Sequence, residues 1–474
     1  MKAARRLAAL SAVVTCVMAL VPLQAWAIRP PIVDPGPPPT GPLGPTEPTE
    51  LKSLCGIQTG TLPQTDYSLQ TAAETMLDYR GAWKFSRGAG QKVAVIDTGV
   101  NPHPRLPALE AGGDYVSSSN GLQDCDAHGT LVAGIIAATP SPDDGFAGVA
   151  PDAKILSIRQ NSSVYGVQGG GGNQANDPNA VSEGYGNTVT LAYAITRAVS
   201  LGATVINLSE VACSPVGAGL DDKPLGRAVR DAFEHNVVVV AAAGNYNQQG
   251  LCNAQNVMPD PNMPLQTGWD SVRTIASPAW YDPYVLAVGA VTPSAEPADF
   301  SLRGPWVGVA GPGERITSLN PNAPNLTNEV LTRQGWSQIN GTSFAAPFVS
   351  GLVALIRSRF PQLNAGQVME LIKRTAHTPG AGPNASTGYG VIDPVAALTN
   401  RLPSPNELPN PDAGYRIPGR PRVSPASQRA RTIVLWVTAG AVALMAVAAA
   451  AAVARRRRED RVRGAETDDV DLLR

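Results

Sequence analysis

The sequence predicts an α/β fold in which helices cover both faces of a mainly parallel sheet. Two short β-branched runs, 93–96 and 237–240, lead into glycine-containing turns, as buried strands of parallel sheets do. Two apolar segments, 129–138 and 348–356, are typical of buried helices. Because open α/β sheets carry their sites at the carboxyl ends of the strands, the polar residues that follow the runs are the candidates for function.

Length and composition fit one large domain with accessory segments. The chain has 474 residues, and its net charge of −1 gives no electrostatic reason to expect a nucleic-acid partner. Only 16% of the residues are charged, and the 47 glycines and 43 prolines indicate many loops and some spacer. The sequence has no dense acidic loop for calcium, and we assign neither a cofactor nor a metal.

The first 27 residues have the pattern of a secretory signal peptide. Basic residues precede an apolar stretch over 7–23, and Ala25-Trp26-Ala27 supplies a small-residue cleavage site. An uncleaved anchor is the alternative. The signal places the residues that follow outside the cytoplasm.

Proline-rich segments flank the predicted main domain, which covers 81–400. The N-terminal extension, 28–80, has nine prolines between 30 and 48, which favours an extended, polyproline-like chain. A second proline-rich segment, 401–431, is expected to be a linker. Within the main domain, the polar, glycine-rich stretch 166–186 is expected to be a flexible surface loop.

A membrane-spanning helix is predicted over 432–454. These 23 residues carry no charge, and at about 1.5 Å per residue they can cross a hydrocarbon core of about 30 Å. Four arginines then begin the segment 455–474, which suits a cytoplasmic tail. Five arginines also lie between 416 and 431, on the other side of the span, so the signal peptide decides the orientation. We therefore expect a single-pass protein of the cell membrane, embedded in the lipid bilayer, with its main domain on the extracytoplasmic side.

Asp97 and His128 are candidates for an acid and a base. Asp97 ends the run 93–96 and precedes a glycine turn, so it is expected at the carboxyl edge of the sheet. His128 precedes the apolar helix over 129–138. A histidine in this position is more often structural, but beside an acid and a nucleophile it can act as a general base.

Residues 341–347, Gly-Thr-Ser-Phe-Ala-Ala-Pro, give a serine the setting of a nucleophile. Gly341 allows a sharp turn, and the helix that follows places Ser343 near a helix N-terminus, where free N–H groups favour negative charge. Alone, the heptapeptide could be a helix cap built from small residues. In the order Asp97, His128, Ser343, the three residues predict a catalytic triad in which His128 accepts the serine proton and Asp97 orients the imidazole.

Asn245 completes the predicted site. It follows the run 237–240 and the small residues 241–244, so its side-chain amide is expected at a strand end. There it can donate to a tetrahedral oxyanion, together with the backbone N–H of Ser343. An asparagine that caps a turn is the alternative.

These four motifs resemble those of the subtilisin-like (S8) serine proteases, over about 81–400. The resemblance implies a subtilisin-like fold with Asp97, His128 and Ser343 as the triad. It also implies that the strand over 206–209 pairs with the substrate backbone. It implies further that the substrate is bound by Ser209, Ala242, Ala243 and Gly244. Many subtilisins continue from that serine with Leu-Gly, whereas this chain has Glu210-Val211, so the substrate preference cannot be carried over.

The order of signal, extension, protease domain, linker and single span resembles the mycosins, the membrane-anchored proteases of type VII (ESX) secretion systems. This resemblance implies protein substrates secreted by a type VII system and partners among the membrane components of that system. It also implies that the extension wraps the catalytic domain without inhibiting it, and that the protein has a second role in the secretion complex.

Four cysteines remain after signal removal: Cys55, Cys125, Cys213 and Cys252. Three pairings are possible in an oxidising compartment. On the fold that the chain resembles, the loops that follow the substrate strand and Asn245 meet at one rim of the cleft, which favours Cys213 with Cys252. Cys55 is then expected to tie the extension to Cys125. A metal site made of Cys125 and His128 is the rival, but it would consume the base.

We expect a serine endopeptidase that processes type VII secretion substrates and also supports the secretion complex. The alternative is a mainly structural component of the membrane complex with dispensable proteolysis. A broad degradative protease fits poorly with a membrane anchor. An intact triad argues for retained activity but does not rank the first two hypotheses.

Overall fold

The structure, a computed structural model, describes residues 28–169, 177–181, 184–248, 250, 252–257, 265–332, 334–400 and 425–468. The chain divides into two units at residue 411, and the C-terminal helix belongs to the second. The expected signal peptide over 1–27 and the expected linker up to residue 424 lie outside the described residues.

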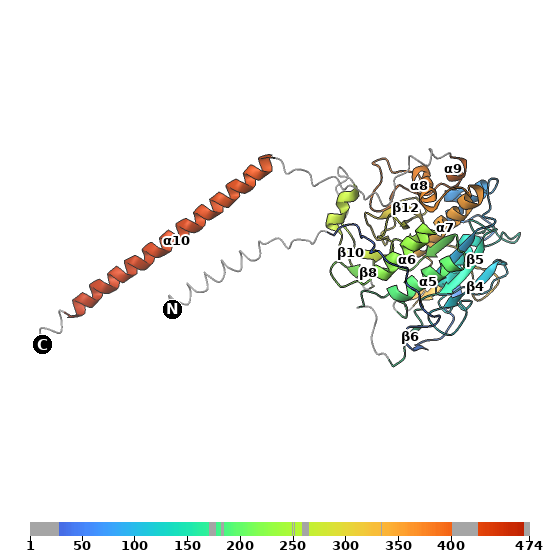
Figure 1. Ribbon diagram of the computed structural model, residues 1–474, viewed down its shortest axis with the longest axis horizontal. Helices are drawn as coiled ribbons and strands as arrows, with labels where there is room; N and C mark the ends of the chain where they lie inside the picture. The colour runs from blue at the N-terminus through green and yellow to red at the C-terminus, as the bar shows by residue number, and fades with distance from the viewer. Residues whose placement is uncertain are drawn as a thin grey trace. The chain divides into compact units, whose positions relative to one another are not determined.

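A seven-stranded parallel sheet forms the centre of the first unit (Figure 1). The strand order is β12-β11-β9-β7-β3-β5-β4. The strands are β3 (Lys92–Asp97), β4 (Leu109–Asp114), β5 (Lys154–Arg159), β7 (Val205–Leu208), β9 (Val238–Ala242), β11 (Val285–Val291) and β12 (Val307–Pro312). The predicted α/β class is confirmed, and the runs 93–96 and 237–240 form two of the central strands, β3 and β9.

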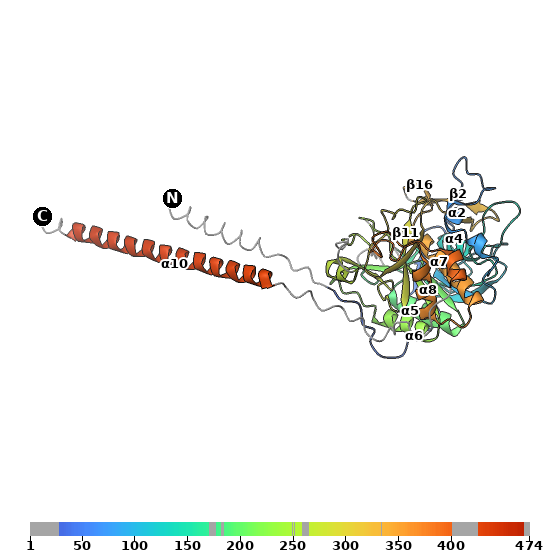
Figure 2. The same ribbon diagram turned by 90° about the horizontal axis from the view of Figure 1, so that it is seen from above.

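Each face of the sheet is buried under helices. Val93 and Val95 of β3 join one core, which includes Leu131 of α4, whereas Ala94 and Ile96 join the other. This alternation is what a strand covered on both faces requires, since successive side chains point to opposite sides. Helices α4 and α7 pack on the first face and α5 and α6 on the second (Figure 2).

The helices of the first unit are listed here with their bounds: α2 (Ala72–Leu77), α3 (Tyr79–Ala82), α4 (His128–Ala137), α5 (Thr188–Ser200), α6 (Lys223–Glu234), the 3-10 helix η2 (Leu265–Ser271), α7 (Thr342–Arg359), α8 (Ala365–Thr375) and α9 (Pro394–Thr399). Asn187 begins α5 and Asn364 begins α8, each with a capping box that satisfies backbone N–H groups at the helix start. The apolar segments predicted as buried helices lie within α4 and α7.

Short antiparallel strands surround the central sheet. The pairs and triplets are β1 (Thr49–Leu51) with β6 (Tyr165–Val167), β8 (Ala212–Pro215) with β10 (Thr274–Ser277), β13 (Ser318–Leu319) with β14 (Leu326–Thr327), and β2 (Thr59–Gly60) with β15 (Glu329–Thr332) and β16 (Gly335–Gln338). The stretch 166–186, expected as a surface loop, begins in β6 and forms bridges at Ala180 and Tyr185. Part of it lies outside the described residues.

The N-terminal extension is fastened to the main domain at several points. It supplies β1 to β6 and β2 to β15, so backbone hydrogen bonds anchor two separate parts of it. Gly56 and Ile57 both donate their N–H groups to the carbonyl of Cys125, at 3.1 Å. Cys55 also forms a disulfide with Cys125, with Cα atoms 4.4 Å apart. In the described residues, no extension hydrogen bond reaches Asp97, His128 or Ser343.

Removing the Cys55–Cys125 disulfide is expected to loosen the extension. The two cysteines are 70 residues apart in the sequence. In the chain-entropy model, a disulfide that closes a loop of that length contributes roughly 4 kcal/mol to the free energy of unfolding. In the double variant Cys55→Ser/Cys125→Ser, we expect a lower denaturation midpoint and faster trypsin cleavage at Lys52. Unchanged cleavage at Lys52 would show that β1 and β2 alone hold the extension.

The second unit contains α10 (Pro425–Asp468). Within α10, the segment Ala439–Arg458 has a mean hydropathy of 1.5 and is not buried, so it is long and apolar enough to cross a membrane. The uncharged stretch 432–454 lies entirely in α10. The helix therefore begins inside the expected linker and continues into the expected tail.

Candidate active site

Asp97 and His128 meet at the carboxyl edge of the sheet. Asp97 is the last residue of β3 and is fully buried, and His128 is the first residue of α4. Their side chains are joined by a hydrogen bond of 2.7 Å between His128 Nδ1 and Asp97 Oδ1. A carboxylate is an acceptor, so Nδ1 carries the proton, and Nε2 is left to accept one from a nucleophile.

A buried network braces this pair. Thr98 Oγ1 accepts a hydrogen bond from the N–H of Gly129, next to His128, and donates to Asp124 Oδ1 at 2.9 Å. Asp124 also accepts from the N–H and the hydroxyl of Thr130, within the first turn of α4. The network fixes the start of α4 against the end of β3. Thr98 and Asp124 were not predicted as site residues, although both lie within four residues of a predicted triad member.

Ser343 lies in the first turn of α7, after the turn at Gly341. A side chain at Gly341 would bring a Cβ atom within 2.8 Å of Ser343 Oγ and 3.4 Å of Asn245 Nδ2, so only glycine fits this close approach. The ring of Phe344 packs on the ring of His128, with centroids 5.0 Å apart. Ser343 is only 5% exposed.

In the part of the chain that the structure describes, Ser343 Oγ and the His128 imidazole share no hydrogen bond. Such contacts between a nucleophile and its base are often long without substrate and tighten when substrate binds. The structure thus brings Asp97 and His128 into direct contact, and it places Ser343 beside them through the contact of Phe344 with the imidazole.

The side-chain amide of Asn245 has a defined orientation. Asn245 Oδ1 accepts from the N–H of Thr342 at 2.9 Å and from its hydroxyl at 3.0 Å. A backbone N–H can only donate, so the atom that faces it must be the oxygen, and the NH₂ group of Asn245 is left for another acceptor. Both Nδ2 and Ser343 Oγ border the same space at Gly341. The arrangement can therefore place a donor beside the atom that Ser343 attacks.

Ser209 is hydrogen-bonded to Ser343, but the strand before Ser209 is not available to a substrate. Residues 206–208 belong to β7, whose backbone pairs with β3 on one side and β9 on the other. With both sides occupied, these residues cannot pair with a substrate, so that expectation is wrong for them. Ser209 lies past the strand end, and its hydroxyl donates to the carbonyl of Ser343 at 2.7 Å.

The side chains of Ala242 and Ala243 are not exposed to solvent. Their side chains are buried in opposite cores, and Gly244 faces the Cys213–Cys252 disulfide, where an added Cβ would lie 3.3 Å from both sulfurs. This segment can contact a substrate only through backbone atoms. The pairing of Cys213 with Cys252 is the one expected from the sequence. Cys125 is likewise held in a disulfide, which removes it as a metal ligand and sets aside the rival metal site.

Carboxylates dominate the electrostatics around His128. Burial lowers its pKa, but the charge and hydrogen bond of Asp97, followed by the charges of Glu210 and Asp124, raise it well above its usual range. Glu210 Oε1 lies 3.8 Å from His128 Nδ1, and burial raises the pKa of Glu210 to about 7 despite the attraction of His128. In the sequence, Glu210 was recognisable only as a departure from the subtilisin pattern.

The raised pKa of His128 predicts the pH dependence of catalysis. A general base must be neutral, so kcat/KM should fall as the pH drops through the pKa of His128, with a midpoint above 6.5. Glu210→Gln removes one negative charge that stabilises the imidazolium, so the midpoint should move to lower pH. Glu110→Gln, near the start of β4, is the matched control and should leave the profile in place. A profile of Glu210→Gln equal to that of the unmodified protein would contradict this electrostatic picture.

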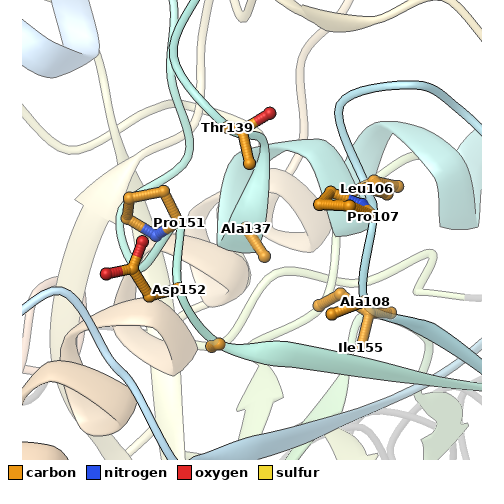
Figure 3. Close-up of a pocket in the computed structure, with 9 residues that line it drawn as sticks. Leu106, Pro107, Ala108, Ala137, Thr139, Pro151, Asp152 and Ile155 are labelled. Atoms are coloured by element: carbon orange, nitrogen blue, oxygen red, sulfur yellow. The ribbon is translucent and has the colours of Figure 1, made fainter.

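A cavity elsewhere in the domain lacks comparable chemistry. It has a volume of about 270 Å³ and is lined mainly by apolar residues, including Ala137, Pro151 and Ile155 (Figure 3). Ala137 is the last residue of α4, about 14 Å from His128 along the helix. Asp152, which also lines the cavity, is paired with Arg87 at 3.0 Å. In the described part of the chain, no three His, Cys, Asp or Glu residues are grouped for a metal.

Comparisons with known proteins show the family to which the chain is similar. Residues 88–390 match the family model described as the subtilase family, Peptidase S8. Mycosin-1 of Mycolicibacterium smegmatis is 44% identical over 407 residues, which cover 82% of this chain and 89% of that protein. The solved structure of the MycP3 protease from the type VII (ESX-3) secretion system is 44% identical, with a TM-score of 0.73, and the match covers 79% of this chain and 100% of that one. A chain in the structure of an intact ESX-5 inner membrane complex is 38% identical, with a TM-score of 0.72, over 88% of this chain and 99% of that one.

Proposed function

Since this chain belongs to the mycosins, within the subtilase family, and is a subtilisin-like serine endopeptidase, we propose that Ser343, His128 and Asp97 form its catalytic triad. The observation that carries the proposal is that these three residues and Asn245 meet at one edge of the sheet. The Asp97–His128 hydrogen bond lies beside Ser343 at the start of α7, and the free NH₂ group of Asn245 faces the same space.

The geometry supports acyl transfer in two steps. Ser343 Oγ attacks the scissile carbonyl while its proton passes to His128 Nε2, and Asp97 stabilises the resulting imidazolium. The oxyanion accepts hydrogen bonds from Asn245 Nδ2 and the Ser343 N–H, whose position near the start of α7 adds favourable dipole charge. The imidazolium then protonates the leaving amine. Water, deprotonated by His128, attacks the acyl-enzyme and releases the acid.

The proposed substrates are proteins secreted by a type VII system. Solved structures named for ESX systems, at 38% and 44% identity over most of this chain, support that assignment. A digest of a peptide library with this protein, using Ser343→Ala as control, tests the proteolytic function. Cleavage that is absent from both samples would oppose it.

A second candidate function is support of the secretion membrane complex. The observation that favours it is the similarity to a chain within the ESX-5 inner membrane complex. Complementation of a deletion strain with Ser343→Ala separates the two functions. Restored secretion would assign the essential role to assembly, whereas lost secretion with normal protein levels would assign it to proteolysis.

We further propose a single-pass orientation with the protease outside and the end of α10 inside. An added protease should then degrade residues 28–400 in intact spheroplasts, while an epitope placed after Arg458 stays protected. The apolar segment Ala439–Arg458 and the signal-peptide pattern of the first 27 residues support this prediction. Release of the whole chain by carbonate washing would contradict a spanning helix.

A further inference from the structure

Glu210 lies beside the proposed catalytic histidine. It directly follows Ser209, whose hydroxyl is bonded to the carbonyl of the proposed nucleophile. Its side chain is 29% exposed, and its carboxylate oxygen Oε1 lies 3.8 Å from His128 Nδ1. Glu210 therefore borders the proposed catalytic residues and is partly open to solvent.

Among the acids near His128, Glu210 differs in having no hydrogen-bond donors. Asp97, Asp124 and Asp126 each accept from N–H or hydroxyl groups, Asp126 from Ser162 and Ser163. Over the described ranges, the Glu210 carboxylate accepts no hydrogen bond, and its one ion pair is with His128. A half-buried carboxylate without donors is costly, so it favours a partner that brings positive charge and N–H groups.

No fixed positive charge balances these acids. Asp97 lies on β3, Asp124 and Asp126 lie in the loop before α4, and Glu210 follows β7. None of the four is paired with a lysine or arginine in the described part of the chain, and the imidazole of His128 lies within ion-pair distance of two of them, Asp97 and Glu210. Arg159 of β5 is the register partner of Asp97 in the sheet, but its guanidinium lies 3.6 Å from the carboxylate of Asp114 instead.

We propose that Glu210 is a specificity-determining residue that pairs with a lysine or arginine side chain of the substrate next to the scissile bond. This inference rests on the proposed proteolytic function of the same site. An ammonium or guanidinium group supplies the donors that Glu210 lacks, in a charge-assisted hydrogen bond. An acidic substrate side chain would instead add a like charge to four carboxylates.

A basic substrate would also favour the reaction itself. Glu210, once paired with a substrate cation, stabilises the imidazolium of His128 less, so more of the histidine is neutral and able to accept the serine proton. We therefore expect the preference for basic substrates to appear in kcat/KM, and to weaken as salt screens the exposed part of the pair.

The test uses fluorogenic peptides that are cleaved by the full-length protein in detergent. Each set is identical except for one position near the scissile bond, occupied by Lys, Gln or Glu, and the three nearest positions on each side are scanned in turn. For the unmodified protein we expect kcat/KM to be about tenfold higher with Lys than with Gln at one position, and lower still with Glu. In Glu210→Gln the Lys-to-Gln ratio should fall to about 1, and in Glu210→Lys the Glu peptide should become the better substrate.

Equal rates with Lys and Gln at every scanned position of the unmodified protein would overturn the inference. So would a Lys preference that survives in both Glu210 variants. Labelling of Ser343 by a fluorophosphonate shows which variants retain a folded, reactive site. If the unmodified protein is neither labelled nor able to cleave any peptide, the result counts against the proposed function. If the unmodified protein cleaves peptides without a charge preference, the result counts only against the role of Glu210.

Discussion

Ser343→Ala is expected to remove nearly all peptide hydrolysis. Without the hydroxyl no acyl-enzyme can form, and the remaining groups can only polarise the substrate for attack by water. In subtilisin, a member of the same family, loss of the serine or the histidine lowers kcat by about 10⁶-fold. A similar loss is expected here, measured as the rate of cleavage of the best library peptide. Ser294→Ala, in an exposed turn, is the matched control.

The double variant Ser343→Ala/His128→Ala tests whether the residues act as a unit. Once the serine is gone, His128 has no proton to accept, so its removal should lower the residual rate little further. Additive losses would indicate that His128 serves some other step. Turnover of Ser343→Ala close to that of the unmodified protein would rule Ser343 out as the nucleophile.

Asn245→Ala is expected to reduce kcat by roughly 10²–10³, the range found when the oxyanion donor is removed from subtilisin. The substitution leaves the Asp97–His128 hydrogen bond intact, so Ser343 should still react with a fluorophosphonate. It also removes the acceptor of the Thr342 N–H, at a helix start, so the denaturation midpoint should be measured alongside. Asn253→Ala, at an exposed asparagine of the neighbouring loop, provides the control.

An unchanged kcat in Asn245→Ala would refute the oxyanion assignment. Loss of both turnover and labelling, with a lower denaturation midpoint, would instead show that Asn245 mainly holds the start of α7 in place. Asn245→Asp separates the two further, because its carboxylate can still accept from Thr342 but cannot donate to an oxyanion.

The candidate site was largely predictable because each part depends on local sequence. Asp97 ends a β-branched run that predicted a buried strand, and Ser343 lies just after a glycine turn, at the start of a long apolar helix. Such features are encoded within about ten residues. The parallel sheet follows from the same signal, since strands buried on both faces are apolar throughout.

Contacts between distant segments were not predictable in this way. The sequence predicts a strand over 206–208, but only the order of strands in the sheet shows that both edges of this strand are already paired. The proline-rich composition of the extension favours extended chain, yet β1 and β2 exist because β6 and β15 offer partners more than a hundred residues away. Strand pairing of this kind depends on the partner and not on propensity alone.

The sequence alone therefore determined the fold class and the family, because those are properties of short motifs and of hydrophobic pattern, and it predicted the residues that we propose for the chemistry. Tertiary structure decided how these residues are oriented and charged. The hydrogen bond from the Thr342 N–H to Asn245 Oδ1 fixes the orientation of the Asn245 amide, and the fold places Glu210 within 3.8 Å of the imidazole of His128. Orientation and pKa depend on distances between atoms that are far apart in the chain, and only folding fixes those distances.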